Sequence, residues 1–349
     1  MKERNIYFDY LKGLACIAVV FLHFRLPGYA GLITGALAKF AVPLFFMISG
    51  YYALSENQYN VKRKIIHILK MTVSAECVIF VYELLKTVAQ HQSLKSYLLS
   101  CFGIEQIFQM LIFNKPLNYG YLWFLYALIY CYATLWILRI IKLDKTIPLA
   151  ILAGGGAIAF VVLGEVTALM GKDYHCSLSI FGQTISVAVF NIFIFRALPW
   201  FLMGRCFKIN YEKLSNFNIP TIFLVLIGSI SEIFEYYSIG WLQFYIGTFV
   251  VSVSLFWAAM NENMRVSPNR VGFKLMQHIG EKDSDFVYIA HMIVGSMLIT
   301  MAKLSPFIDT SSSVFVFGKT LIVILISLGL AEIRNFYNSK LLGRLNQPK

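Results

Sequence analysis

The chain has 349 residues, of which 58% are hydrophobic and only 14% are charged, and its mean hydropathy is +0.68. Soluble domains are about half apolar and a quarter charged, so this composition excludes an ordinary soluble protein and indicates a polytopic membrane protein. The net charge of +12 does not indicate a nucleic-acid partner, because the basic residues lie between apolar runs rather than on one solvated face.

Ten apolar runs are long enough to cross about 30 Å of hydrocarbon as helices. We therefore predict an all-α fold in which residues 1–349 form a single membrane domain. The predicted spans are 8–26, 36–54, 65–88, 119–140, 147–169, 180–204, 219–238, 240–260, 284–303 and 314–333. The segment 98–113 is apolar but short and is broken by Gly103, which favours an interfacial or re-entrant segment.

The basic residues predict how these spans are oriented. With the N-terminus in the cytoplasm, 20 of the 30 Lys and Arg residues lie in inside segments and five lie in outside segments. This bias follows the positive-inside rule. It predicts ten spans with both termini cytoplasmic.

The first span, "DYLKGLACIAVVFLHF" (9–24), carries three ionisable side chains on one helical stripe. Lys12 and His23 are eleven residues apart, which places them about 20° apart around the helix and about 16 Å apart along its axis. Asp9 lies three residues before Lys12, so these two can pair at the membrane edge. His23 lies deep in the run, where it is either a hydrogen-bonded packing residue or a proton-transfer group.

The third span begins with "NVKRKIIHILK" (60–70), a cluster of Lys62, Arg63, Lys64 and His67 followed by Lys70. The cluster has two interpretations. It is either an orientation signal in contact with anionic lipid headgroups or a phosphate site that faces a cytosolic cofactor.

Further ionisable residues in or beside the apolar runs indicate a polar interior path. They are Glu76, Glu83, Glu165, Arg196, Glu232, Glu235, His291, Lys319 and Glu332. A transporter with an ionisable midplane path is therefore one reading of the sequence. The six cysteines show no CxxC or other metal-type spacing, so no metal is expected.

Several segments, taken in order, resemble the acyltransferase-3 family of integral membrane O-acyltransferases. They are Arg4 with "FDYLKGLACIAVVFLH", "VPLFFMISGYY" (42–52), the basic start of the third span, "YLWFLYALIY" (121–130), "FRALPWFLMG" (195–204) and "FVYIAHMIV" (286–294). The resemblance extends over nearly the whole chain.

The resemblance implies a ten-helix acyltransferase that moves an acetyl group from acetyl-CoA to a hydroxyl of an extracytoplasmic polysaccharide or other envelope glycan. Its basic-x10-His motif falls on Lys12 and His23, which makes His23 the expected general base. Lys12 and Asp9 are the other expected catalytic residues, and they are expected to order the cofactor path rather than to touch His23. Its RxxR motif falls on Lys64 and His67, neither of which is Arg, so Lys62, Arg63 and Lys70 are expected to help these two residues bind CoA. The expected location is the plasma or inner membrane of a bacterial-type cell. Membrane lipid is an expected partner and nucleic acid is not, and the oligomeric state is left open.

Overall fold

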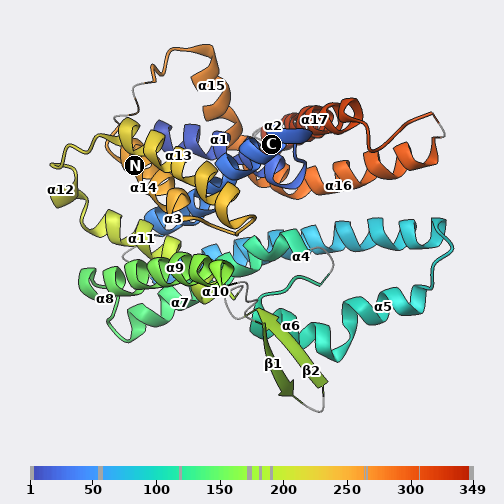
Figure 1. Ribbon diagram of the computed structural model, residues 1–349, viewed down its shortest axis with the longest axis horizontal. Coiled ribbons are helices and arrows are strands. Elements are labelled where there is room, and N and C mark those ends of the chain that lie inside the picture. The colour runs from blue at the N-terminus through green and yellow to red at the C-terminus, as the bar shows by residue number, and fades with distance from the viewer. Residues whose placement is uncertain are drawn as a thin grey trace. The chain divides into compact units, whose positions relative to one another are not determined.

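The protein is described by a computed structural model, which is mainly α-helical (Figure 1). The described residues are 4–53, 58–117, 120–170, 175–180, 183–188, 192–262, 264, 266–305 and 307–345. Some predictions lie outside the described residues. They concern four of the basic residues counted above, of which Lys2, Arg265 and Lys349 are counted as inside and Lys172 as outside, and parts of the spans predicted at 36–54, 119–140 and 180–204.

Eight segments of the described chain are helical, long and apolar enough to cross a membrane. They are Ile6–His23, Gly28–Tyr52, Val61–Ala89, Gly120–Ile140, Thr146–Val166, Thr221–Ile239, Val271–Leu304 and Ser313–Lys340. Each overlaps one predicted span, so the multi-pass helical architecture is confirmed. The predicted span 240–260 corresponds to a shorter apolar helix, Ile246–Met260. The total of ten spans is not confirmed, and the orientation of the termini stays a prediction.

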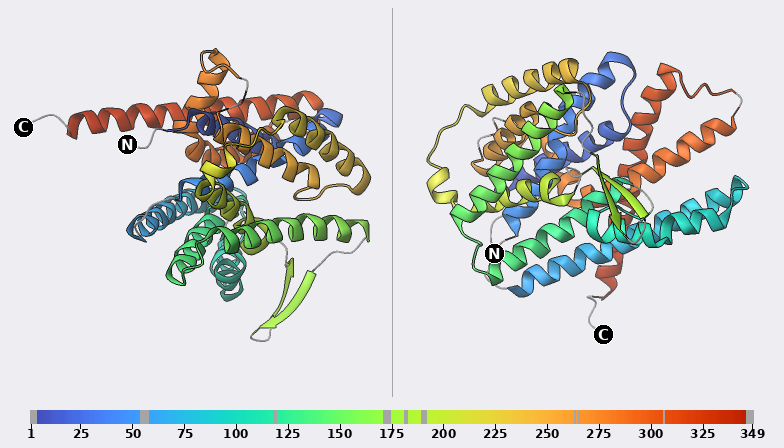
Figure 2. Two further views of the ribbon diagram at one scale, coloured as in Figure 1. Left: turned by 90° about the vertical axis from the view of Figure 1, so that its left-hand side faces the viewer. Right: turned by 60° about the horizontal axis from the view of Figure 1, so that its bottom comes forward.

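The predicted span 180–204 is not one helix in the structure, which corrects that prediction. Two antiparallel strands, β1 (His175–Ile180) and β2 (Gln183–Ala188), pair with His175 opposite Ala188, and the hairpin is drawn in light green in Figure 2. The central residues of β2, 184–187 (TISV), alternate polar and apolar and include three β-branched side chains, a pattern typical of a strand. Mean hydropathy does not detect that alternation.

The chain forms two compact units, and the first comprises Met1–Phe45, Ile219–Gly240 and Ile246–Lys349. Its 3-10 and π helices are η1 (Ala38–Phe40) and η5 (Ile279–Asp283). Its α-helices are α1 (Ile6–His23), α2 (Gly28–Leu37), α13 (Thr221–Ile239), α14 (Ile246–Met260), α15 (Val271–His278), α16 (Ser284–Leu304) and α17 (Ser313–Leu345). α3 (Ala41–Tyr52) begins in this unit and continues into the second.

Helix α1 is the central element of the first unit. It contacts α14, α15, η5, α16 and α17, and α16 and α17 also lie side by side (Figure 1). Cys16 and Val20 of α1, and Phe24 directly after it, pack with Val287 and other buried residues of α16 and α17. The stripe of α1 that carries the ionisable residues therefore faces other helices over most of its length. This placement is expected, because an ionisable side chain that faced lipid would cost free energy.

The close approach of α1 to α15 and η5 depends on Gly13 and Gly280. A Cβ on Gly13 would lie 1.9 Å from the carbonyl oxygen of Met276, and a Cβ on Gly280 would lie 1.8 Å from that of Asp9. No side chain fits at either position unless the helices separate.

Gly13→Ala is therefore expected to destabilise the protein by about 1–3 kcal/mol, the usual cost of overpacking. The melting temperature of the detergent-solubilised protein measures this effect. Gly329→Ala in α17 is the matched control, because nothing lies within 4 Å of a Cβ added there. Alanine at that helical position should leave stability unchanged or raise it by about 0.5–1 kcal/mol. Equal melting temperatures for Gly13→Ala and the wild type would contradict the close approach.

The second unit comprises Phe46–Asn218 and Trp241–Tyr245 and contains the β1–β2 hairpin. In it, α3 packs closely on α11 (Leu198–Ile209), since a Cβ on Gly50 would lie 1.8 Å from the carbonyl oxygen of Phe201. Its further elements are α4 (Gln58–Ala89), α5 (Leu94–Phe102), α6 (Ile104–Phe113), η2 (Gly120–Leu122), α7 (Trp123–Ile140), α8 (Thr146–Ala150), η3 (Ile151–Gly155), α9 (Gly156–Leu169), α10 (Phe193–Arg196), α11 (Leu198–Ile209) and α12 (Tyr211–Leu214).

Candidate active site

The amino-terminal end of α1 is fixed by a capping asparagine. The side-chain oxygen of Asn5 accepts hydrogen bonds from the backbone N–H groups of Tyr7 (2.9 Å) and Phe8 (3.2 Å). Its Nδ2 donates to the carbonyl oxygen of Ala259 in α14 at 2.9 Å. This N-cap satisfies two of the free N–H groups of the first turn and attaches the helix to α14.

Asp9 forms the centre of an ion-pair network at this end of α1. Its carboxylate is buried and accepts from Arg4 Nε at 2.5 Å and from Lys12 Nζ at 2.8 Å. Arg4 also contacts Glu281 of η5 at 3.0 Å. The predicted ion pair between Asp9 and Lys12 is present. Asp9 lies in the first turn of α1, where a negative charge interacts favourably with the helix dipole.

His23 is the last residue of α1 and is exposed. Its ring centroid lies 5.3 Å from that of His291 in α16, with 44° between the ring planes. His291 is fully buried, and its Nδ1 lies 2.9 Å from the carbonyl oxygen of Val287. The pair therefore combines one accessible imidazole with one buried imidazole, and the two rings would repel each other if both were protonated.

The chain directly after His23 is held by α16 and α17. The carbonyl oxygen of Phe24 accepts a hydrogen bond from Thr320 Oγ1 at 3.0 Å. A Cβ on Gly295 would lie 1.9 Å from the Phe24 ring, so this ring rests directly on the backbone of α16. These contacts fix the position of the His23 backbone.

A third polar group lies inside the first unit, between η1, α13 and α14. Thr248 Oγ1 donates to Glu232 Oε1 at 2.5 Å, and both residues are fully buried. Lys39, which is also buried, interacts electrostatically with Glu232. The opposite charges offset part of the cost of burying Lys39 and Glu232.

The residues predicted to bind the cofactor all lie near the start of α4, in the second unit. Lys62, Arg63, Lys64 and His67 are exposed. The buried residues of this part of the helix are Val61 and Ile68. The structure therefore brings the four basic side chains to one helix end, where a solvated anion can reach them, and it leaves both interpretations of the cluster open.

The sequence analysis places His291 among the ionisable residues of a polar interior path, but it does not pair His291 with His23 and does not name Lys39. Lys39 is a single ionisable residue inside an apolar run, and that signal could have identified it. The sequence analysis names Arg4 only as part of the first segment of the family resemblance and predicts no partner for it. Its partner Glu281 is 277 residues away in the chain, so no local pattern predicts that contact.

The fold and these polar groups define a class: a multi-pass helical membrane protein with ionisable side chains at both ends of its first helix. A family model described as an acyltransferase domain, Acyl_transf_3, matches residues 5–332. The chain therefore belongs to the acyltransferase-3 family and is a membrane acyltransferase, which confirms the family indicated by the sequence motifs. No match is found among curated proteins or solved structures.

Proposed function

We propose that the protein is an O-acetyltransferase that moves an acetyl group from cytoplasmic acetyl-CoA to a hydroxyl of an extracytoplasmic polysaccharide or other envelope glycan. Its proposed location is the plasma or inner membrane of a bacterial-type cell. The observation that carries the proposal is the accessible imidazole of His23, held beside buried His291 in a chain of this family. An imidazole titrates near neutral pH, so it suits a general base for an alcohol.

In the proposed reaction, His23 takes the proton of the acceptor hydroxyl while the oxygen attacks the carbonyl carbon of the thioester. The new C–O bond forms and the C–S bond breaks, and the CoA sulfur leaves as a thiolate. The protonated His23 then returns its proton to that sulfur. His291 acts as a positioning residue, because its ring packs against the ring that moves the proton.

Asp9 and Lys12 serve a different step, because they lie about 21 Å and about 16 Å along the axis from His23. We assign them to the donor path, where the cation of Lys12 attracts the anionic cofactor and Asp9 holds Lys12 in place. The phosphates of CoA are assigned to Lys62, Arg63, Lys64 and His67, whose exposed cationic or hydrogen-bonding side chains suit phosphate.

Replacing Arg63 and Lys64 together by Ala is expected to raise the acetyl-CoA concentration needed for half-maximal transfer by about tenfold, because each lost cation removes a charge-assisted contact. The maximal rate should change little. The measurement is initial rate against acetyl-CoA concentration in membranes. A double variant of two other exposed lysines, Lys145→Ala with Lys213→Ala, is the control. If the dependence of the rate on acetyl-CoA concentration is unchanged, the basic residues of α4 act as an orientation signal and not as a CoA site.

The whole proposal is tested with membranes that contain the protein or lack it. They are given acetyl-CoA labelled in the acetyl group, and label is counted in the envelope glycan fraction. Label that appears only with the protein, and that mild base releases as acetate, supports an O-acetyl ester. Uptake of a solute without any consumption of the thioester would favour the transporter reading and overturn the proposal.

A further inference from the structure

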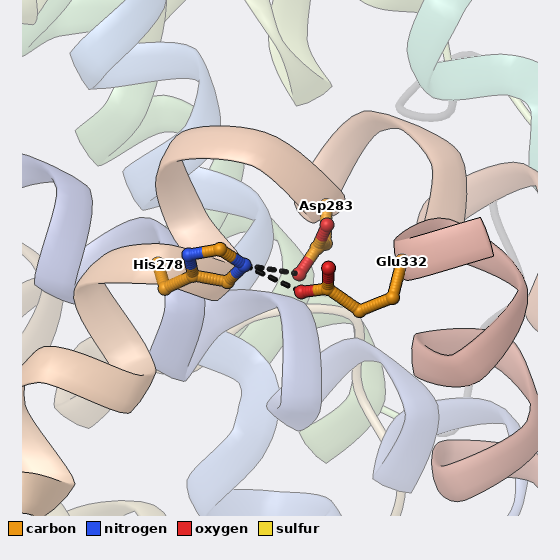
Figure 3. A group of neighbouring side chains, drawn as sticks. All are labelled: His278, Asp283 and Glu332. Atoms are coloured by element: carbon orange, nitrogen blue, oxygen red, sulfur yellow. Dashed lines mark hydrogen bonds and ion pairs between the residues drawn. The ribbon is translucent and has the colours of Figure 1, made fainter. Parts of the chain in front are cut away.

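Three side chains of the first unit that the proposed reaction does not use converge on one point. His278 ends α15, Asp283 ends the π-helix η5, and Glu332 lies on α17. One ligand atom from each lies within 4.8 Å of the other two. Figure 3 shows the imidazole of His278 pointing at both carboxylates. His278 Nε2 lies 2.5 Å from Glu332 Oε1 and 3.8 Å from Asp283 Oδ2.

The π-helix explains how His278 and Asp283 come together. In a regular α-helix, residues five apart in sequence point about 140° apart around the axis and cannot share a ligand. Here the five residues between α15 and α16 form a π-turn, Ile279–Asp283. Such turns are rare and are frequent at functional sites. This turn directs His278 and Asp283 to one side, toward α17.

A hydrogen bond to one carboxylate oxygen of Asp283 orients the side chain, so that the other oxygen, Oδ2, faces the cluster. The residue is 1% exposed, and Asn335 Nδ2 donates to its Oδ1 at 2.6 Å. Asn335 follows Glu332 by three residues on α17, so both side chains lie on the same face. A hydrogen bond to the outer oxygen of a carboxylate is the usual way that proteins orient a metal ligand.

The charges of the cluster also favour a cation. Two carboxylates and one imidazole meet within a small, partly buried volume, and the repulsion between the carboxylates is relieved by a positive charge, either an imidazolium at His278 or a bound cation. Arg334 lies nearby, but its Nη2 donates to the carbonyl oxygen of Lys282 at 2.7 Å and to Asn335 at 3.0 Å. Among the described residues it forms no ion pair with Asp283 or Glu332 at salt-bridge distance.

We propose that His278, Asp283 and Glu332 bind one divalent transition-metal ion, of which Zn²⁺ is the first probe. Imidazole with carboxylate ligands suits Zn²⁺, Mn²⁺ or Fe²⁺, whereas Ca²⁺ and Mg²⁺ prefer oxygen ligands alone. Three protein ligands leave a tetrahedral ion one position for water. The ion would join the middle of α17 to the turn between α15 and α16. The sequence analysis expects no metal, so this site departs from that prediction.

The test uses the full chain purified in detergent, stripped with chelator and dialysed against Zn²⁺. Bound zinc is measured by elemental analysis, and affinity is measured by competition with a fluorescent chelator. The wild type should hold one ion per chain. Asn335→Ala should bind about 10–100-fold more weakly, the usual effect of removing an outer-shell partner. His278→Asn and Glu332→Gln should each bind more weakly still. His91→Asn, which removes an exposed histidine elsewhere, should bind like the wild type.

The melting temperature separates metal binding from damage to the fold. Zn²⁺ should raise the melting temperature of the wild type and of His91→Asn, because a ligand that binds only the folded state stabilises it. The His278 and Glu332 variants should melt at the same temperature with Zn²⁺ and with chelator. Either of two results would overturn the site: no stoichiometric zinc on the wild type, or equal affinity in the wild type and the His278 and Glu332 variants.

Discussion

His23→Ala is expected to lower the rate of acetyl transfer about 100- to 10,000-fold, the contribution usual for a general base. The substitution removes the only group that the mechanism assigns to proton transfer. It removes one ring contact, with His291, but little else of the packing, because His23 is exposed at the end of α1 and the helix is capped at its start by Asn5. The rate of label transfer from acetyl-CoA to glycan should therefore fall without a matching loss of protein from the membrane.

Two further variants show whether the loss belongs to proton transfer. His91→Asn replaces an exposed histidine outside the site and should keep wild-type activity. His291→Asn keeps His23 but removes the ring beside it, so it should lower the rate less than His23→Ala and should shift the pH dependence of the rate. Equal rates of acetyl transfer by the wild type and His23→Ala would show that His23 is not the general base.

An acetylated histidine is the main alternative path for the acyl group. In that case, wild-type protein given labelled acetyl-CoA without acceptor should retain label that neutral hydroxylamine removes, and His23→Ala should not. In the direct mechanism neither protein retains label. Both paths need His23, so this comparison decides how the residue acts once the rate loss is established.

Helical periodicity was sufficient to predict the arrangement of α1. The pairing of Asp9 with Lys12 follows from an i,i+3 spacing, and the separation of His23 from both follows from the rise of a straight helix. These are local relations, and the sequence contains all the information that they need. The apolar runs were sufficient for eight candidate spans for the same reason.

Relations between distant segments could not be predicted in this way. His278 and Glu332 are 54 residues apart and meet because α17 packs beside η5. Lys39 finds its counter-charge, Glu232, on a helix nearly 200 residues later in the chain. Hydropathy also failed at 180–204, because an average over a window does not distinguish an apolar helix from a strand with alternating polar residues.

Asp144→Asn is expected to destabilise the protein by about 3 kcal/mol, near the lower end of the cost of breaking a buried ion pair. Asp144 lies between α7 and α8 in the second unit and binds two arginines. Arg205 contacts it through Nε (3.0 Å) and Nη2 (2.7 Å), and Arg139 contacts it through Nε (3.0 Å). All three side chains are nearly buried, so a neutral Asn would leave two desolvated cations without a counter-charge.

The pH dependence of stability provides a second measurement of the same network. Burial raises the pKa of Asp144, but the hydrogen bonds and charges of Arg205 and Arg139 outweigh burial and hold its pKa below the ordinary value. The network therefore stabilises the fold fully above the ordinary Asp pKa of about 3.9, and this stabilisation is lost as pH falls through the lower pKa of the folded state. The melting temperature of the wild type should fall below about pH 4, whereas that of Asp144→Asn should start lower and fall less.

Asp309→Asn is the matched control for this network. Asp309 also lies between two helices, and hydrogen bonds from Ser311 also lower its pKa, but the residue is exposed and its partners are two residues away. Water replaces such local bonds at little cost, so the melting temperature at pH 7 should be close to that of the wild type. If Asp144→Asn and Asp309→Asn have the same melting temperature, then Asp144 does not hold Arg139 and Arg205 in the folded state. If only Asp144→Asn melts early and loses its pH dependence, the stability of this part of the second unit depends on one carboxylate placed between two cations.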